Sequence, residues 1–257
     1  MKNNKLKLII ISLSVIACCI LLAACPDYFG GSPTFNWRDR IEEGGVIYGD
    51  FWYKVNRGTV RIIRYEGPGG KVIIPQEING KPVTAIGAYA FRETELTDVT
   101  IPDTITFIGI GAFTSNQLST IIIPPGVTGI HSGIRGCCIF ECGVFADNKL
   151  NNLVIPDSVT FIGSHAFFHN QLIEITIPDS VRTIDYSAFF ENQLTQITIG
   201  AGVDIGFVTL GFKILGFKNF DLGAFGSGFE AFYYNISGRQ AGTYTRTDSN
   251  SNVWTKQ

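Results

Sequence analysis

The sequence has few charged residues and no marked excess of either sign. It holds 20 Lys and Arg against 22 Asp and Glu in 257 residues, and charged residues are only 16% of the chain. This balance, without long basic runs, argues against a nucleic-acid binder, because such proteins bind by neutralising phosphates. The apolar fraction of 45% is too high for a disordered chain. With 29 Gly, the composition is instead typical of a protein rich in tight turns and sheet.

Long apolar runs are also absent, except at the N-terminus. Three lysines precede a run over residues 8–24 in which two serines are the only polar residues. A basic start, an apolar core and small residues before a cleavage point predict a secretory signal over residues 1–24. The alternative is a retained membrane anchor, since the run is at the lower limit of length for a helix that spans a bilayer.

The end of this run, Leu22-Ala23-Ala24-Cys25, resembles a bacterial lipobox. The resemblance implies that Cys25 is lipidated on its sulfur and becomes the first residue of the mature protein, so that the membrane is a partner through the N-terminal lipid. Two or three acyl chains hold a protein stably, whereas one holds it only marginally. Residues 25–45 contain Gly-Gly-Ser-Pro and Gly-Gly, and we expect them to form a tether.

An internal repeat follows, and several columns of residues keep the same register. The first column consists of prolines that follow an isoleucine, with a glycine in the last position; it recurs at steps of 22, 32, 22 and 22 residues. The columns are Pro102, Pro124, Pro156, Pro178, Gly200; Leu96, Leu118, Leu150, Leu172, Leu194; Phe91, Phe113, Phe145, Phe167, Phe189; and Ile105, Val127, Val159, Val181, Val203. The step of 32 is one repeat with ten extra residues.

The repeat unit, written from residues 172–193, contains Leu-x-x-Ile-x-Ile, whose alternation predicts a short strand with one buried face. The following proline ends the strand because it has no N–H for a ladder hydrogen bond. One such unit cannot bury its apolar side, but stacked units bury a continuous core. We therefore predict a mainly β solenoid of about six coils with short helical turns and a parallel sheet on one face. A propeller is excluded because its blades need about 40 residues.

The repeat resembles a known family, the BspA-type (Treponema-type) leucine-rich repeat lipoproteins. Residues 150–171 match the pattern closely, through Ile155-Pro156-Asp157-Ser158-Val159 and Ala166-Phe167. The resemblance implies a right-handed leucine-rich-repeat solenoid, and binding or adhesion at the cell envelope with no cofactor and no enzymatic activity. It favours the outer membrane or the cell surface over the inner membrane. The alternative is a periplasmic structural or scaffolding protein without an external ligand.

The segments on either side of the repeats are expected to cover the open ends of the core, as solenoids require. Residues 46–70 contain two alternating runs around Asn56-Arg57-Gly58, which predicts an N-terminal capping hairpin. The solenoid of 22-residue units is expected over residues 71–203. Residues 204–257 begin with many aromatic residues and are interpreted as a C-terminal cap and tail, with an aromatic ligand-binding surface as the alternative.

Strand alternation also predicts which side chains face solvent on the sheet. Such surfaces are what solenoids use to bind partners, so these positions are the candidate ligand-binding face for a protein or a glycan. A merely solvated sheet, whose threonines reflect β-propensity, is the alternative. The predicted face consists of Asp98, Thr100, Thr120, Ile122, Asn152, Val154, Glu174, Thr176, Gln196 and Thr198.

The ten-residue insertion contains three cysteines, Cys137, Cys138 and Cys142. Outside the cytoplasm they suggest one disulfide and one odd thiol. Because adjacent cysteines rarely pair, Cys142 is expected to bond to Cys137 or Cys138. Two alternatives are three reduced thiols and a Cys₃His zinc site with His131, whose spacing fits no standard motif.

We find no catalytic constellation that stands apart from the repeat. His165 and His169 occupy variable positions beside Ala166-Phe167, and we expect both to be surface histidines. The Gly-rich strings lack the strand and helix that a nucleophile elbow or a phosphate loop requires. The sequence therefore predicts neither an enzyme nor a metal centre.

Overall fold

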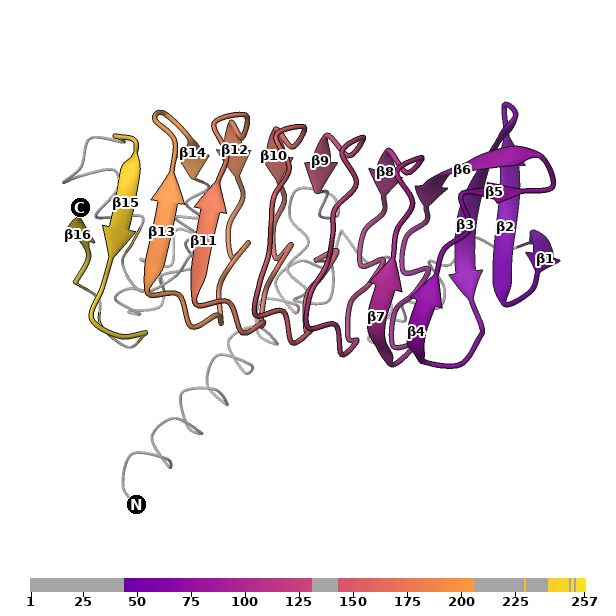
Figure 1. The fold of residues 1–257 in the computed structure, drawn as a ribbon, viewed down its shortest axis with the longest axis horizontal. Coiled ribbons are helices and arrows are strands. Elements are labelled where there is room, and N and C mark those ends of the chain that lie inside the picture. The colour runs from indigo at the N-terminus through magenta and orange to yellow at the C-terminus, as the bar shows by residue number, and fades with distance from the viewer. Residues whose placement is uncertain (1–43, 131–142, 206–228, 230–239, 250, 252) are drawn as a thin grey trace, which may run out of the picture.

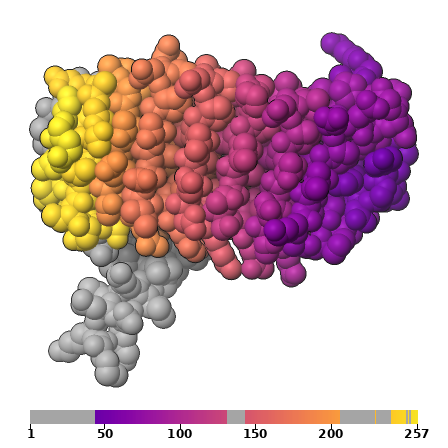
Figure 2. All heavy atoms as spheres, viewed as in Figure 1, coloured from indigo at the N-terminus to yellow at the C-terminus, as the bar shows by residue number. Residues whose placement is uncertain are grey.

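The computed structural model shows a row of coils stacked along one long axis (Figure 1). It describes residues 44–130, 143–205, 229, 240–249, 251 and 253–257. In the space-filling view these coils form one elongated body (Figure 2). The regular elements of the described residues are all strands, which confirms a mainly β solenoid. No helix among these residues is long and apolar enough to cross a membrane.

The N-terminal end of the solenoid is an antiparallel arrangement of three strands. It consists of β1 (Val46–Tyr48), β2 (Phe51–Asn56) and β3 (Thr59–Tyr65). Between β2 and β3, Arg57 and Gly58 have φ angles of 49° and 83°. Two positive φ angles give a type I′ turn, whose twist matches that of the flanking strands. The hairpin joins the first coil where β3 pairs in parallel with β6 (Lys81–Ile86).

One face of the solenoid carries the predicted parallel strands, but they form two separate groups. β4 (Gly70–Ile73) pairs with β7 (Leu96–Thr100), and β11 (Glu174–Ile177) pairs with β13 (Gln196–Ile199). On this face, the pairing between the two intervening coils is reduced to a single bridge between Ile122 and Val154. These coils contain Asn151 and Asn152 at strand positions, and asparagine is disfavoured in strands.

A second ladder of very short strands runs along the opposite edge of the coils (Figure 1). β9, β10, β12 and β14 pair in parallel, while β8 pairs with β6. The strands before and after the insertion remain paired in the same register, since Ile162 lies opposite Ile130. The two-residue strands of this ladder are β8 (Phe107–Ile108), β9 (Gly129–Ile130), β10 (Phe161–Ile162), β12 (Thr183–Ile184) and β14 (Asp204–Ile205). Another short strand, β5 (Glu77–Ile78), pairs antiparallel to β6.

The predicted short helical turns are wrong in detail, because left-handed residues interrupt them. In four coils the chain turns around Ala-Phe, and a residue with positive φ stands on either side of this pair; in the coil of Phe145 the pair is Val144-Phe145, followed by Asp147 with positive φ. Such a residue cannot continue a right-handed helix, so the chain makes successive tight turns instead. The non-glycine residues with positive φ at these two positions are Tyr89, His165 and Ser187, and Glu93, Ser115, Asp147, His169 and Glu191.

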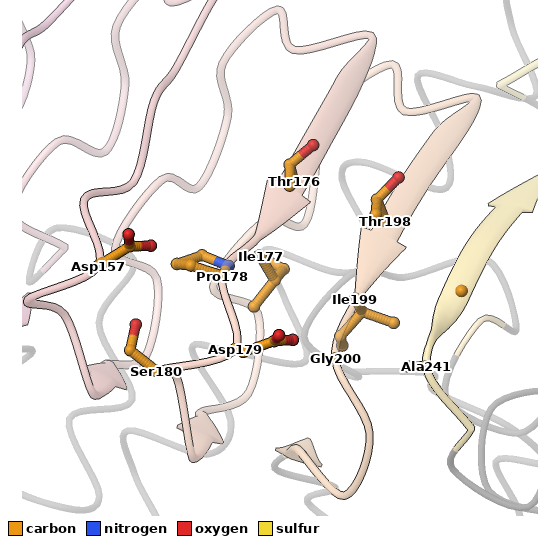
Figure 3. A pocket seen from close by; sticks show the side chains of 11 residues that line it. Asp157, Thr176, Ile177, Pro178, Asp179, Ser180, Thr198, Ile199, Gly200 and Ala241 are labelled. Carbon is orange, nitrogen blue, oxygen red and sulfur yellow. The ribbon is translucent and has the colours of Figure 1, made fainter.

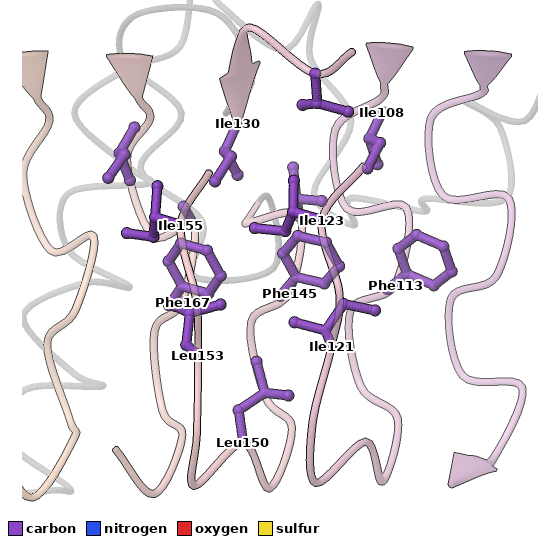
Figure 4. Close-up of a cluster of buried hydrophobic side chains, with 14 of the residues drawn as sticks. Ile108, Phe113, Ile121, Ile123, Ile130, Phe145, Leu150, Leu153, Ile155 and Phe167 are labelled. Atoms are coloured by element: carbon purple, nitrogen blue, oxygen red, sulfur yellow. The ribbon is translucent and has the colours of Figure 1, made fainter. Parts of the chain in front are cut away.

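The core is built from the repeat columns, and its centre is a ladder of phenylalanine rings (Figure 4). The five Phe of the repeat column are fully buried. Their rings stack at centroid distances of 5.1, 5.5, 5.6 and 5.3 Å from Phe91 to Phe189. Tyr65 of the hairpin continues the ladder at 5.3 Å from Phe91. The hairpin therefore covers the first ring of the core.

A ladder of four asparagines lies beside the rings, and all but the half-buried Asn192 are buried. Asn148 illustrates it: its Nδ2 donates to the carbonyl oxygens of Phe113 and Phe145 at 2.9 and 3.2 Å, and its Oδ1 accepts from the backbone N–H of Leu118 at 3.1 Å. Each side chain thus links its own coil to the preceding one. Asn116, Asn170 and Asn192 make the equivalent bonds.

At the C-terminal end, β15 (Gly242–Thr245) adds an antiparallel strand to β13, and β16 (Thr255–Lys256) pairs with β15. The core is closed here by buried Phe229, Tyr244 and Trp254, whose rings pack edge to face. Arg246 is buried against the face of Trp254 and donates to the carbonyl oxygen of Leu194 at 2.6 Å. The last coil is therefore covered by the chain's own C-terminal strands.

Candidate functional site

The exposed side of the sheet carries a row of β-branched side chains that crosses the solenoid. Strand register aligns them, since Ile73 lies opposite Thr100, Ile122 opposite Val154, and Thr198 between Thr176 and Thr243. We call these seven residues the β-branched stripe: Ile73, Thr100, Ile122, Val154, Thr176, Thr198 and Thr243. Ile73, Ile122 and Val154 are 75%, 82% and 71% exposed. These apolar side chains are thus presented to solvent rather than used in the core.

A second row, the polar row, runs beside the stripe. Its ends are aligned by register, with Lys71 opposite Asp98 and Gln196 between Glu174 and Thr245. Lys71 and Asp98 form an exposed ion pair at 3.9 Å, which contributes little to stability. The polar row consists of Lys71, Asp98, Thr120, Asn152, Glu174, Gln196 and Thr245.

All ten residues predicted for the ligand-binding face lie on these two rows. Eight are exposed, whereas Gln196 and Thr198 are half-buried. The reason is β15, which covers the outer edge of β13 and places the hydroxyl oxygen of Thr243 3.0 Å from that of Thr198. The rows also include four residues that the prediction omitted: Lys71, Ile73, Thr243 and Thr245. The segment Lys71-Val-Ile-Ile-Pro75 already showed the repeat pattern, but β15 carries no repeat signal.

Two shallow hollows lie on this face. The first, the apolar hollow, has a volume of about 270 Å³ and is centred on the bridge between Ile122 and Val154. Thr120, Ile121, Ile123, Asn152 and Pro156 complete its lining. Both central side chains are exposed and apolar, so this hollow can accept an apolar group of a partner without desolvating a charge.

The second hollow, the acidic hollow, has a volume of about 590 Å³ and lies at the strand ends of the last two repeats (Figure 3). Asp157 and Asp179 stand on its rim, and Thr176 and Thr198 lie along the neighbouring strands (Figure 3). Ser180, Gly200, Ala241 and Gly242 also line it. The hollow therefore combines carboxylates and hydroxyls with residues that have little or no side chain.

The two histidines have different surroundings, and the expectation of a surface position is wrong for His165. His165 is 3% exposed, because its positive φ turns the side chain between the rings of Phe168 and Tyr186. Burial lowers the pKa of His165 from 6.5 to about 4, since a desolvated imidazolium is unfavourable. His169 is exposed, and its Nδ1 lies 2.7 Å from Oδ1 of Asp147.

Cys25 and the insertion cysteines Cys137, Cys138 and Cys142 lie outside the described residues, as does His131. Their lipidation, disulfide and zinc hypotheses stay predictions. Within the described part of the chain, no group of three or more His, Cys, Asp or Glu side chains could hold a metal ion.

The comparison with known proteins agrees with this architecture. A family model described as "BspA type Leucine rich repeat region" matches residues 84–143 and 138–207, with six copies. The chain belongs to the BspA-type leucine-rich repeat family. The matched residues include the coils of both hollows. The repeats of this family serve protein binding in general, and its fold is generally a binding or scaffolding one.

Three solved structures of bacterial leucine-rich repeat proteins are similar to this chain. The Treponema pallidum leucine-rich repeat protein is 22% identical over 68% of this chain and 97% of its own, with a TM-score of 0.44. A Bacteroides ovatus protein is 25% identical over 62% of this chain and 45% of its own, with a TM-score of 0.46. A leucine-rich cell surface protein of Faecalibacterium prausnitzii is 24% identical over 65% and 57%, with a TM-score of 0.34. No curated protein matches the chain.

Proposed function

We propose that this chain is a cell-envelope lipoprotein that binds a protein or glycan partner, as an adhesion or binding protein, through the exposed face of its sheet. The observation that carries the proposal is the β-branched stripe. Ile122 and Val154 are more than 70% exposed at the centre of an ordered surface, although the repeat could place threonine there, as it does at Thr100 and Thr176. Exposed apolar groups surrounded by polar residues are characteristic of binding surfaces.

The envelope location is supported by the N-terminal sequence. The apolar run before Leu22-Ala23-Ala24-Cys25 gives a signal and a lipid attachment site, and residues 25–45 give a tether long enough to hold the solenoid away from the membrane. In this arrangement the sheet face is carried by a rigid stack, and only the tether needs to bend.

The location is tested by a Cys25→Ser variant and by protease treatment of intact cells. We expect mass spectrometry of the variant to show no covalent lipid, because the thioether to diacylglycerol cannot form on serine. Protease treatment of intact cells should remove the wild-type protein without lysis. Complete protection from the protease would contradict surface display and favour a periplasmic scaffold.

The binding face is tested by substituting its apolar centre. Ile122→Arg and Val154→Arg change exposed side chains and should leave the folded state intact, while introducing charge where a partner would bury the apolar hollow. We expect loss of binding to host cells or to immobilised matrix proteins and glycans. Phe107→Arg serves as the matched control, because Phe107 is also exposed but lies on the opposite ladder. Equal binding by all three variants would refute the assignment of the face.

A further inference from the structure

Charge is distributed unevenly along the solenoid. Residues 44–83, which contain β1 to β5 and the start of β6, hold six Lys and Arg against three Asp and Glu. Residues 84–130 and 143–205, the described coils behind them, hold three Lys and Arg against eleven Asp and Glu. We call residues 44–83 the basic cap. The nearly neutral total charge of the chain thus conceals a net positive end and a strongly negative row of coils.

Several cations of the basic cap gather at the outer half of the hairpin formed by β2 and β3. Lys54 lies directly opposite Arg61 in the strand register, and Arg57 stands in the turn between the strands. Like charges placed opposite each other destabilise a strand pair, so attraction across the hairpin does not account for this arrangement. The turn projects from the molecule at this end (Figures 1 and 2). Arg64, further along β3, is neutralised by an ion pair with Glu66 at 3.0 Å.

Exposed apolar side chains lie in the same cap. Val46, Ile47 and Tyr48 of β1 are 58%, 56% and 45% exposed, and Val55 beside the turn is 51% exposed. Ile47 lies opposite the half-buried Trp52 of β2. Cations next to exposed apolar and aromatic side chains are typical of surfaces that bind a bilayer, because the apolar groups enter the headgroup region while the cations meet anionic lipids. This combination is a second observation, independent of the charge, that indicates a lipid surface.

The basic cap is also the part of the solenoid that follows the predicted lipid attachment site most closely in the sequence. β1 begins at Val46, 21 residues after Cys25. A flexible chain of this length has a root-mean-square span of about 25 Å. A lipid on Cys25 would therefore keep the cap close to the bilayer, at an effective concentration on the order of millimolar. Contacts that are weak in solution become sufficient to dock the cap, because the second contact is intramolecular.

From these observations we infer that the basic cap is a membrane-docking surface, which binds the anionic headgroups of a lipid bilayer. The inference rests on the proposed function, in which Cys25 carries a lipid, and it adds an orientation to that function. The field of a charged bilayer falls off over about 8 Å at physiological salt. Within that range the bilayer attracts the basic cap and repels the acidic coils. The solenoid would therefore stand on its cap, with the coils of Ile122 and Val154 directed away from the membrane and accessible to a partner.

Lysine labelling on vesicles tests this orientation. The protein purified from cells is added to preformed vesicles of phosphatidylcholine alone or of an equimolar mixture with phosphatidylglycerol. Acetic anhydride, an uncharged reagent, then acetylates the accessible lysines, and mass spectrometry of peptides gives the rate at each position.

On the anionic vesicles we expect the labelling rates of Lys54 and Lys81 in the basic cap to fall about fivefold, the effect of one cation held at an anionic surface. The protection should be lost in about 0.5 M salt, which screens the attraction. Lys149 and Lys256 serve as internal controls, because both are exposed and lie outside the cap. Their labelling rates should be the same on the two kinds of vesicle.

Three variants test whether the cations of the cap cause this protection. Arg57→Gln and Arg61→Gln each remove one cation from the hairpin without removing a labelled lysine. Each should weaken docking about fivefold, which is measured as faster labelling of Lys54 and Lys81 on the anionic vesicles. Arg182→Gln is the matched control, because it removes the same charge from an exposed position on the acidic coils. It should leave the labelling of the cap lysines unchanged.

The inference is overturned if the cap lysines are labelled equally fast on neutral and anionic vesicles, or if Arg182→Gln accelerates their labelling as much as Arg57→Gln does. It is also overturned if the same lysines become protected without vesicles as the protein concentration rises. That result would assign the basic cap to the acidic coils of a second copy of the chain.

Failure of this inference is distinguishable from failure of the proposed function. Mass spectrometry of the same samples shows whether Cys25 carries a lipid. A protein without lipid whose cap lysines are still protected at high vesicle concentration would remove the anchor and leave the docking surface. A lipidated protein whose cap lysines are not protected would leave the anchor and remove the docking surface, and the Ile122→Arg result depends on neither.

Discussion

The asparagine ladder makes a quantitative prediction about what holds successive coils together. In Asn148→Ala the backbone N–H of Leu118 loses its partner Oδ1, and the carbonyl oxygens of Phe113, Phe145 and Ala146 lose the Nδ2 donor. Phe113 retains a donor, because Nδ2 of Asn116 also reaches its oxygen at 3.0 Å. The principal loss is therefore the buried N–H of Leu118, which costs about 1–3 kcal/mol when it is left unsatisfied.

Urea unfolding of the purified protein, followed by circular dichroism, measures this loss. We expect Asn148→Ala to lower the free energy of unfolding by about 2–3 kcal/mol, because the N–H of Leu118 is left without a partner and the missing side chain leaves a small cavity. Asn148→Asp keeps an acceptor for Leu118 but places a carboxylate against three carbonyl oxygens, so it should be the more destabilising of the two at neutral pH. The matched control is Asn152→Ala, whose side chain is exposed on the polar row and should change stability by less than about 0.5 kcal/mol.

The comparison between the two asparagines decides the result. If Asn148→Ala and Asn152→Ala unfold at the same urea concentration, the ladder hydrogen bonds contribute nothing measurable, and the coils are held by apolar packing alone. If the ladder hydrogen bonds do contribute, Asn148→Ala should also reduce the cooperativity of unfolding. Because stability in a solenoid is a sum of coil and interface contributions, a weakened interface at Leu118 should broaden the transition or divide it into two.

Two further predictions concern the core. Phe145→Ala removes a fully buried ring from the middle of the ladder and should lower the free energy of unfolding in urea by about 3–5 kcal/mol. Phe107→Ala changes an exposed ring and should lower it far less. Equal effects of the two substitutions would contradict a continuous ring stack. For His165, the pKa in the folded state is lowered to about 4, so the unfolded chain binds the proton first. The free energy of unfolding should therefore fall by about 3 kcal/mol as the pH is lowered from above 6.5 toward 4. In urea titrations at pH 4 to 7, His165→Gln should make the free energy of unfolding less dependent on pH. An unchanged pH profile would contradict burial of the imidazole.

The columns of the repeat predicted the core well, because each column position has one environment in every coil. Leu, Ile, Val and Phe recur there at a fixed step, and all five column Phe are buried. The same logic predicted the exposed rows, since strand alternation assigns Thr120 and Glu174 to the face opposite the buried Ile121 and Ile175. A repeat thus shows several times which residue types occupy one structural position, and so predicts whether that position is buried or exposed.

Prediction was weaker where a single residue or a segment outside the repeat decides the structure. His165 stands at a variable position, and only the positive φ shared with Tyr89 and Ser187 reveals that this position points inward. Similarly, the acidic hollow depends on β15, whose pairing with β13 joins segments with no sequence relation. The sequence did not predict the ladder of two-residue strands that contains Ile162 and Ile184, because strands of this length leave no periodic signal.

The departures from the repeat are therefore the positions that carry information about function. At their usual column positions, proline ends a strand, threonine lies on the exposed face of the sheet, and asparagine links one coil to the preceding one. Ile122 and Val154 replace hydroxyls with apolar groups on the face. Neither of these two substitutions improves the core, since both residues lie outside it. A surface that departs from its own repeat at adjacent coils, on one face and without benefit to packing, is best explained by a partner that contacts this face.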